Sequence, residues 1–110
     1  MKKFLAIYHA PAAALAQMEN MTAEQKAKGM EPWMKWNAKV GDQMVDFGAP
    51  CMGGQSLNPA GVWSASDKEV SGYTLVQANS LADAQSLFAD HPHLSWAPGC
   101  SIELHECLAM

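Results

Sequence analysis

The chain has 110 residues, of which 49% are apolar and 16% are charged, and its formal net charge is -4. This length is typical of one domain, and this composition is typical of a chain that buries a core rather than of a disordered one. The seven basic residues are scattered and form no stripe, which argues against nucleic acid as a partner. We therefore expect residues 1–110 to form a single globular domain.

The cysteines and the N-terminal segment indicate whether the protein is cytoplasmic or secreted. There are three cysteines and no CxxC pair, which does not suit the disulfide framework of a secreted protein. Residues 1–17 carry the lysines, apolar run and Ala-Leu-Ala of a signal peptide, but Tyr8, His9 and Pro11 interrupt the run, so a strand is the better interpretation. No run approaches the ~18 apolar residues of a membrane span. We expect a cytoplasmic protein with reduced thiols and no membrane partner.

The first half of the chain predicts a strand, a long helix and a second strand. Residues 4–9 are rich in strand formers, and the alanine-rich residues 12–18 allow a helical turn. Thr22 and Gln25 match a capping box that opens the long helix, and Gly41 is placed to end it.

Small and apolar side chains recur along this helix at three- and four-residue steps, which predicts a stripe that faces the core. The stripe comprises Ala23, Ala27, Met30, Met34 and Ala38. Pro32 predicts a kink or a restart near Glu31, because proline removes a backbone hydrogen bond. A second strand follows at residues 44–47, closed by Gly48 and Pro50.

The second half predicts a loop, a small hairpin, a strand, a helix and a last strand. In that order, these elements lie at residues 51–60, 62–64 with 69–70, 73–78, 81–88 and 101–108. Asn79 or Ser80 caps the helix, and the dipeptide His91-Pro92 ends it.

This order of elements predicts an α+β ferredoxin-like βαββαβ fold with an inserted hairpin and an antiparallel sheet covered by helices on one side. The uncovered face of such a sheet leaves an apolar patch large enough to drive association. We therefore expect a homodimer in which two sheets face one another.

Two tryptophans three residues apart, Trp33 and Trp36, project from neighbouring positions on the long helix. One interpretation is that both pack in the core against the sheet. The other is that they form the aromatic wall of a ligand cleft, because their face is offset from the methionine stripe and large aromatic side chains commonly line pockets.

The histidines are candidates for acid–base chemistry, since an imidazole titrates near neutral pH. His93 or His105 could act as a general base, and His9 ends the first strand where it could point toward the same cleft. Asp90 could orient the base or protonate a leaving group, with capping or exposure near the helix end as the alternative. Asp46 lies in a strand, where aspartate is disfavoured, so it is either exposed or held by a polar contact.

Metal binding is not expected. Glu103, His105 and Cys107 alternate along one strand, where their side chains stand parallel and rarely converge on one ion. We expect them to line a polar space between two sheets. No cofactor is expected either.

Three segments resemble the YCII-related family of the dimeric α/β-barrel superfamily. They read WMKWNAKVGDQMVDFGAP at residues 33–50, GYTLVQANSLADAQSLFADHPHL at residues 72–94 and SIELHE at residues 101–106. The resemblance implies a ferredoxin-like homodimer, with a cleft lined by the long helix and by the loop after the second helix.

The resemblance also implies a place for catalytic residues, because in some members a His–Asp pair is proposed to do acid–base chemistry. Asp90 matches the position of that aspartate. Trp33 and Trp36 stand where the histidine would belong, and residues 68–71 replace the Asp-Gly-Pro-Phe motif of the related branch.

Three functions follow as hypotheses. The first is a small-molecule enzyme that eliminates or isomerises a polar aromatic or carbonyl compound, with Asp90, His93 and His9 as its catalytic residues. The second is a non-catalytic ligand-binding or dimerisation module, and the third, by superfamily analogy, is a cofactor-free oxygenase of quinol-type substrates. The expected substrate-binding residues are Trp33, Trp36, Asp46, Pro50 and His105.

Overall fold

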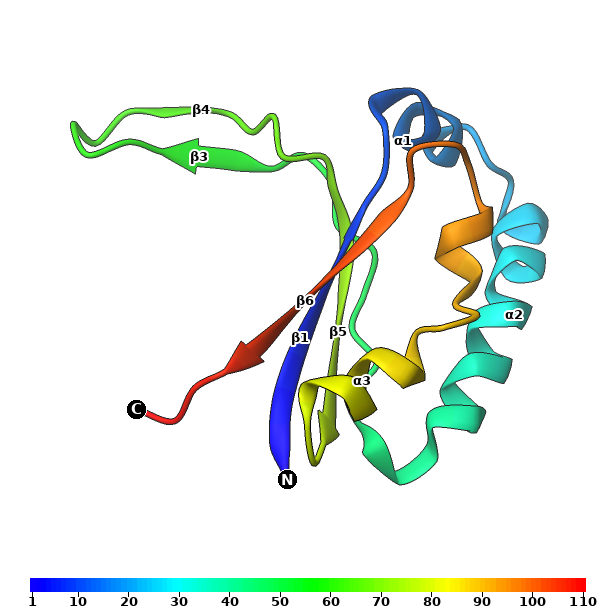
Figure 1. The fold of residues 1–110 in the computed structure, drawn as a ribbon. Coiled ribbons are helices and arrows are strands. Elements are labelled where there is room, and N and C mark those ends of the chain that lie inside the picture. Colours follow the sequence, from blue (N-terminus) through cyan, green and yellow to red (C-terminus); the bar gives the residue numbers. More distant parts are fainter.

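A computed structural model describes residues 1–110 and shows a two-layer α+β architecture (Figure 1). Four strands form an antiparallel sheet in the order β2-β5-β1-β6, with helices over one face. The strands are β1 Lys2–His9, β2 Met44–Asp46, β5 Val70–Ala78 and β6 Ser101–Cys107. Apart from the hairpin between β2 and β5, this is the βαββαβ order of a ferredoxin-like fold, so the predicted fold class is confirmed.

The helical layer follows the local signals of the sequence. Thr22 and Gln25 form the predicted capping box, with the Thr22 hydroxyl accepting from the Gln25 N–H at 3.1 Å and the Gln25 amide oxygen accepting from the Thr22 N–H at 2.9 Å. Ser80 caps the last helix by accepting from the N–H of Asp83 at 3.1 Å. The helices are α1 Ala12–Glu19, α2 Ala23–Val40 and α3 Leu81–Leu87, with short 3-10 turns η1 Gly41–Gln43 and η2 Pro92–Ser95.

The buried stripe of α2 differs from the predicted one. All five residues of the alanine–methionine stripe are exposed, whereas Trp36 and Val40 are buried and Trp33 is half-buried beside them. The helix turns this face inward because two indole rings bury more apolar area than alanines and methionines do. The predicted restart near Glu31 is also wrong, since α2 is continuous through Pro32. Pro32 is exposed, where water can satisfy the carbonyl that it leaves unpaired.

The hairpin exists, but the predicted pairing was wrong. Its strands are β3 Gln55–Leu57 and β4 Trp63–Ala65, which pair only with each other, so residues 51–60 are not all loop. Asn58 closes the turn, accepting from Gly61 N–H at its carbonyl (2.9 Å) and from Val62 N–H at its side chain (3.0 Å). The other predicted strand, residues 69–70, instead leads into β5.

The core lies between the sheet and the helices. Alternate residues of β1 point into it, and the rest of the cluster comes from α2, β5 and the region of α3. Its buried members are Phe4, Ala6, Tyr8, Trp36, Val40, Val76, Ala78, Ala84 and Phe88. The other sheet face carries no helix, and the hairpin projects beyond it (Figure 1). No helix combines the length and apolar character needed to cross a bilayer.

We expect Gly48→Ala to be among the most destabilising small substitutions. Gly48 has φ +82°, and a Cβ there would lie 1.8 Å from the carbonyl oxygen of Tyr73, so the β2–β5 edge must shift. The matched control is Gly53→Ala, since Gly53 has φ +68° with open space around its Cβ. Urea unfolding should show a loss of about 3 kcal/mol or more for Gly48→Ala and about 1 kcal/mol for Gly53→Ala. Equal losses would contradict the steric argument.

Candidate functional site

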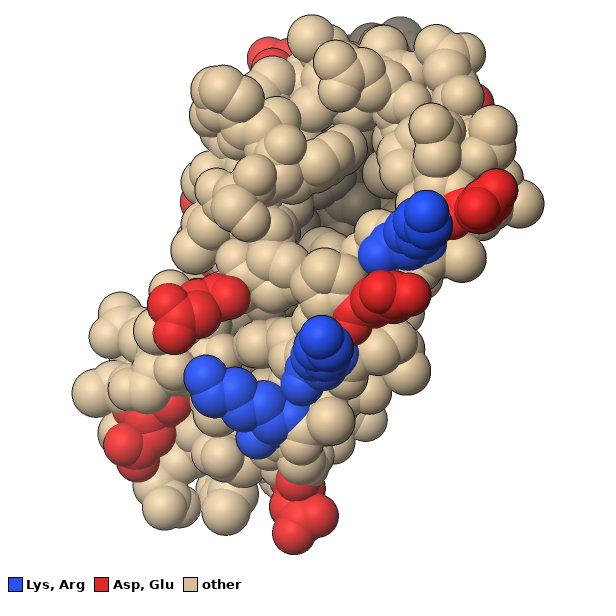
Figure 2. Space-filling view, turned by 90° about the vertical axis from the view of Figure 1, so that its right-hand side faces the viewer, with Lys and Arg blue, Asp and Glu red and all other residues tan.

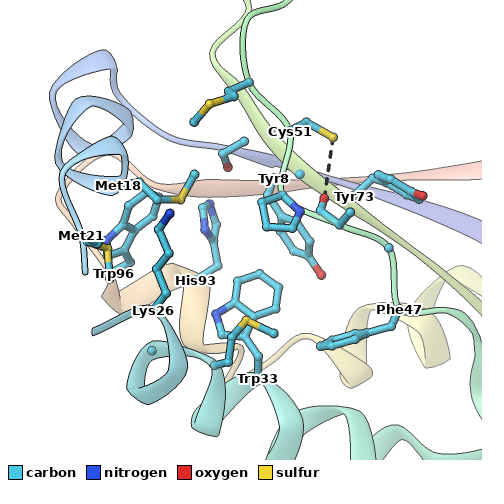
Figure 3. Close-up of a pocket in the computed structure, with 18 of the residues that line it drawn as sticks. Tyr8, Met18, Met21, Lys26, Trp33, Phe47, Cys51, Tyr73, His93 and Trp96 are labelled. Atoms are coloured by element: carbon cyan, nitrogen blue, oxygen red, sulfur yellow. Dashed lines mark hydrogen bonds between the residues drawn. The ribbon is translucent and has the colours of Figure 1, made fainter. Parts of the chain in front are cut away.

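A cavity of about 740 Å³ lies between the N-terminal helices and the β2–β5 edge of the sheet. Its wall is mainly apolar, with methionines from the helical side and aromatic rings from strands, helix and turn (Figure 3). On the helix-covered face, an uncharged hollow lies beside a row of alternately charged side chains (Figure 2). The volume and the character of the wall suit a small organic molecule.

The two tryptophans take one role each. Trp36 is 5% exposed, and its indole N–H donates to the Leu87 carbonyl oxygen at 2.7 Å, so it belongs to the core. Trp33 lines the cavity, with its ring 5.0 Å from Tyr8 and 6.4 Å from Phe47. The core interpretation therefore holds for Trp36, while Trp33 packs against the core cluster and also lines the cavity, and its ligand role stays a prediction.

His91 lies beneath the cavity wall rather than in it. Its ring is enclosed by Trp33 at 4.5 Å, Trp36 at 4.3 Å and Phe88 at 5.8 Å between centroids. Burial, and secondarily the neighbouring imidazole of His93, lowers the pKa of His91 to about 3. His91 is therefore a neutral structural group at physiological pH.

A directed hydrogen-bond chain runs through this neutral ring. Thr74 donates its only hydroxyl proton to the Phe47 carbonyl at 2.9 Å, so it must accept from the Tyr8 hydroxyl at 2.6 Å. The Tyr8 oxygen then accepts from His91 Nε2–H at 3.3 Å. The other His91 nitrogen, Nδ1, accepts from the backbone N–H of His93 at 3.0 Å, which requires the same tautomer.

Tyr8 is held by this chain and is not an acid at neutral pH. Burial, opposed by the hydrogen bond to Thr74, raises the pKa of Tyr8 to about 12. The hydroxyl proton is already committed to Thr74, and the ring forms part of the cavity wall.

His93 is the buried imidazole that reaches the cavity. Its Nε2 lies 2.8 Å from the His9 carbonyl oxygen, which can only accept, so Nε2 carries the proton and Nδ1 is the basic nitrogen. The backbone of Ser101 is a second hydrogen-bonding neighbour of this ring, and His93 is 2% exposed. Burial, only partly offset by backbone oxygens, lowers the pKa of His93, which keeps the base form populated.

Two charged side chains, Lys26 and Glu19, also line the cavity. Lys26 extends from α2 beside Met18, Met21 and Trp96 at one side of the cavity (Figure 3), and it is exposed. It is not paired with any carboxylate of the chain, including that of Glu19. An unpaired ammonium beside an apolar wall can hold the anionic group of a ligand.

The other expected site residues lie outside this cavity, except Pro50, which lines it. Asp90 is exposed just after α3, and Asp46 accepts from the Gly48 N–H at 2.8 Å in the turn after β2. His9 at the end of β1 lies between buried Tyr8 and Ala10, and His105 pairs with Leu5 on the same face of the sheet, so both histidines face its open side.

On that open face, His9 and His105 share one carboxylate. The His9 Nε2 lies 2.8 Å from Glu103 Oε1, and the His105 Nε2 lies 3.7 Å from the same oxygen. Burial alone would lower the pKa of His9, but Glu103 and the Lys68 carbonyl raise it above its usual value. The hydrogen bond from His9 in turn lowers the pKa of Glu103. No three His, Cys, Asp or Glu side chains are arranged to hold a metal ion.

Several lining residues carried no clear signal in the sequence. They are Tyr8, Met18, Lys26, Phe47, Cys51 and Trp96. Tyr8 could have been found from strand alternation, because it shares a face with core residues Phe4 and Ala6. The others come from α1, α2, the segment after β2 and the end of η2, and the approach of these parts depends on tertiary packing.

The chain matches no protein-family model, and no curated protein matches it. Among solved structures, it is similar to that of 5-chloro-2-hydroxyhydroquinone dehydrochlorinase from Burkholderia phenoliruptrix in complex with 2,5-dihydroxybenzoquinone. The identity is 14% and the TM-score is 0.49, over 94% of this chain and 91% of the other.

Because His91 is neutral in the folded protein, we expect the free energy of unfolding to fall on acidification. Folded His91 takes up a proton only near pH 3, whereas unfolded His91 takes one up near pH 6.5, so the unfolded chain binds more protons between these values. The contribution of His91 to the free energy of unfolding should therefore fall by about 2 kcal/mol between pH 7 and pH 5. His9, whose pKa is raised, contributes with the opposite sign.

Urea unfolding at pH 7, 6 and 5 checks this prediction, with His91→Gln as the comparison because glutamine does not titrate. The difference in unfolding free energy between the wild type and His91→Gln should shrink as the pH falls. A difference that stays constant across this range would show that His91 is not held neutral.

Proposed function

We propose that this protein binds a small planar aromatic molecule in the cavity and exchanges a proton with it through His93. The observation that carries the proposal is a buried imidazole, held by Nε2–H on the His9 carbonyl, that lines an aromatic and methionine-lined cavity of about 740 Å³. The resemblance to the YCII-related family supports a ligand site in this cavity, since it implies a cleft lined by the long helix and by the loop after the second helix.

The proton transfer that this geometry favours is simple. A hydroxyl of the bound aromatic molecule gives its proton to His93 Nδ1, leaving an oxyanion on the ligand and an imidazolium on the protein. The imidazolium remains anchored through Nε2–H to the His9 carbonyl. A general base placed in this way begins an elimination or an isomerisation and contributes about 10²–10⁴-fold to a rate.

Lys26 is the second feature of the cavity that would recognise the ligand. Its side chain lines the cavity and has no carboxylate partner, so its ammonium stabilises an anionic group on the ligand. The preferred ligand class is therefore an aromatic anion, either a carboxylate or a phenolate. Glu19 on the same wall opposes this preference and limits its strength.

A binding module without turnover is the second candidate. It is favoured by the place of Asp90, which is exposed after α3 and is not among the cavity residues. Without Asp90, the aspartate of the expected pair is missing from the cavity. Proton exchange with a bound ligand separates the two candidates.

The proposal includes a homodimer formed through the open sheet face. The central strand presents Leu5 and Ile7 there, opposite Leu75 and Tyr73 of β5 in register. Apolar cross-strand pairs on an uncovered face favour association of two sheets. The cavity lies on the opposite, helical side, so ligand access does not compete with this dimer.

Two dyes of the same shape test the ligand class: 1-anilinonaphthalene-8-sulfonate, which is an anion, and N-phenyl-1-naphthylamine, which lacks the sulfonate. Fluorescence titration should show that Lys26→Met weakens the anionic dye about fivefold, an effect of about 1 kcal/mol, and leaves the neutral dye unchanged. Trp33→Leu should weaken both dyes, because it removes part of the wall. Lys28→Met, on the same helix but outside the cavity, is the control. Equal effects of the two lysine variants would exclude Lys26 from recognition.

Ionisation of bound 4-nitrophenol tests the proton exchange, because its phenolate is visible by absorbance. The wild type should lower the apparent pKa of the bound dye by about one unit. His93→Gln retains a donor for the His9 carbonyl but has no basic nitrogen, and should remove at least half of that shift. The matched control is His105→Gln on the open face, which should behave as the wild type. Identical titration curves for the wild type and His93→Gln would show that the ligand binds without exchanging a proton with His93.

A further inference from the structure

The hairpin formed by residues 55–65, here called the arm, is nearly detached from the rest of the chain. Its strands pair only with each other, and every residue from Gln55 to Ala65 is exposed. Three large apolar side chains are more than half exposed on it: Leu57 at 54%, Val62 at 57% and Trp63 at 62%. A two-stranded hairpin is only marginally stable in water by itself, so the arm needs a surface to pack against.

The arm also lacks the features that keep an exposed hairpin soluble. None of residues 47–66 is charged, in a chain with 18 charged side chains. Exposed edge strands are usually protected by charged side chains, lysine above all, whereas the buried centres of interfaces are depleted of charge. An uncharged arm that presents a tryptophan therefore has the composition of an interface.

The accessible surface area of the chain is larger than that of a compact monomer of the same mass, and the excess indicates how much surface an interface would cover. The accessible surface is 7380 Å² for a mass of 11.9 kDa, where a compact monomer of that mass exposes about 6,000 Å². The radius of gyration is 15.1 Å, against about 13 Å for a compact domain of this length. The excess of about 1,400 Å² exceeds the ~800 Å² per partner of a standard interface and matches that of an obligate dimer.

The direction of the arm identifies the partner. The arm leaves the body at one end of the sheet and extends over the side that carries no helix (Figure 1). The two uncovered surfaces, arm and sheet face, thus lie on the same side of the molecule. A two-fold axis on that side lets the arm and sheet face of one copy meet those of the other, because a two-fold interface uses the same surface on both partners.

We propose that the arm clasps a second copy of this chain, so that Leu57, Val62 and Trp63 are buried against the partner while the sheet faces meet. This rests on the proposed homodimer and adds to it: the sheet face alone does not hold the two copies together. The arms supply the aromatic anchors, and removing them leaves an assembly that dissociates at micromolar concentration.

Two variants of the arm test this by sedimentation equilibrium over a range of concentrations. In the first, Trp63→Ser removes the largest anchor and should raise the dissociation constant of the dimer by at least about 30-fold. In the second, Asn-Gly replaces residues 55–65, and the dissociation constant should rise by at least about 100-fold. The shortened loop can close because the Ser66 N–H already donates to the Gly54 carbonyl at 2.9 Å.

Met34→Gln is the matched control, since Met34 is 53% exposed on the helical side, away from the arm. It should leave the dimer unchanged. Circular dichroism should show that both arm variants keep the fold, because the arm contributes nothing to the core cluster.

The outcomes separate the two proposals. A wild-type chain that is monomeric at 100 μM overturns both the dimer and the clasp. A wild-type dimer that both arm variants leave intact overturns the clasp alone and assigns the dimer to the sheet face. Weakening by both arm variants, with the control unchanged, supports the clasp.

Discussion

The buried hydrogen-bond chain from His93 through His91, Tyr8 and Thr74 to Phe47 is the constraint on which the site depends. It joins η2, β1, β5 and the turn after β2, segments as far as 83 residues apart in the sequence. Each proton in it is committed in one direction, so no member can turn without leaving a buried polar group unpaired, at a cost of about 1–3 kcal/mol. The same chain that fixes the tautomer of His91 thus fixes the backbone of His93, and with it the imidazole that lines the cavity.

Much of the fold could be predicted because its signals are local. The capping box at Thr22, the cap at Ser80 and the strand-forming runs each act within a few residues, and together they gave the order of elements. The face of α2 and the partner of β4 could not be predicted in this way. The buried side of α2 depends on the hydrogen bond from the Trp36 indole N–H to the carbonyl of Leu87, a residue 51 positions away in the sequence. The hairpin partner depends on where the turn at Asn58 closes.

The site was only partly predictable for a similar reason. Trp33, Pro50 and His93 were expected near a ligand, and the structure brings these three together around one cavity. His9 looked equivalent to His93 in the sequence, yet strand alternation sends it to the opposite face, where it meets Glu103. A sequence places residues on elements, but the partition of histidines between the two faces requires the register of the sheet.

The uncharged segment 47–66 joins the cavity to the arm. Its first residues, Phe47 to Met52, form one wall of the cavity, and the same chain continues directly into the arm. Pro50 forms an isolated bridge with Gly72, and the Cys51 N–H donates to the Ser71 carbonyl at 3.0 Å, so the base of the arm is tied to β5 at the cavity itself. A partner that holds the arm in place therefore also holds the cavity wall. The absence of charge along the whole segment agrees with the two proposals taken together, in which its base faces a bound ligand and its tip faces a second copy.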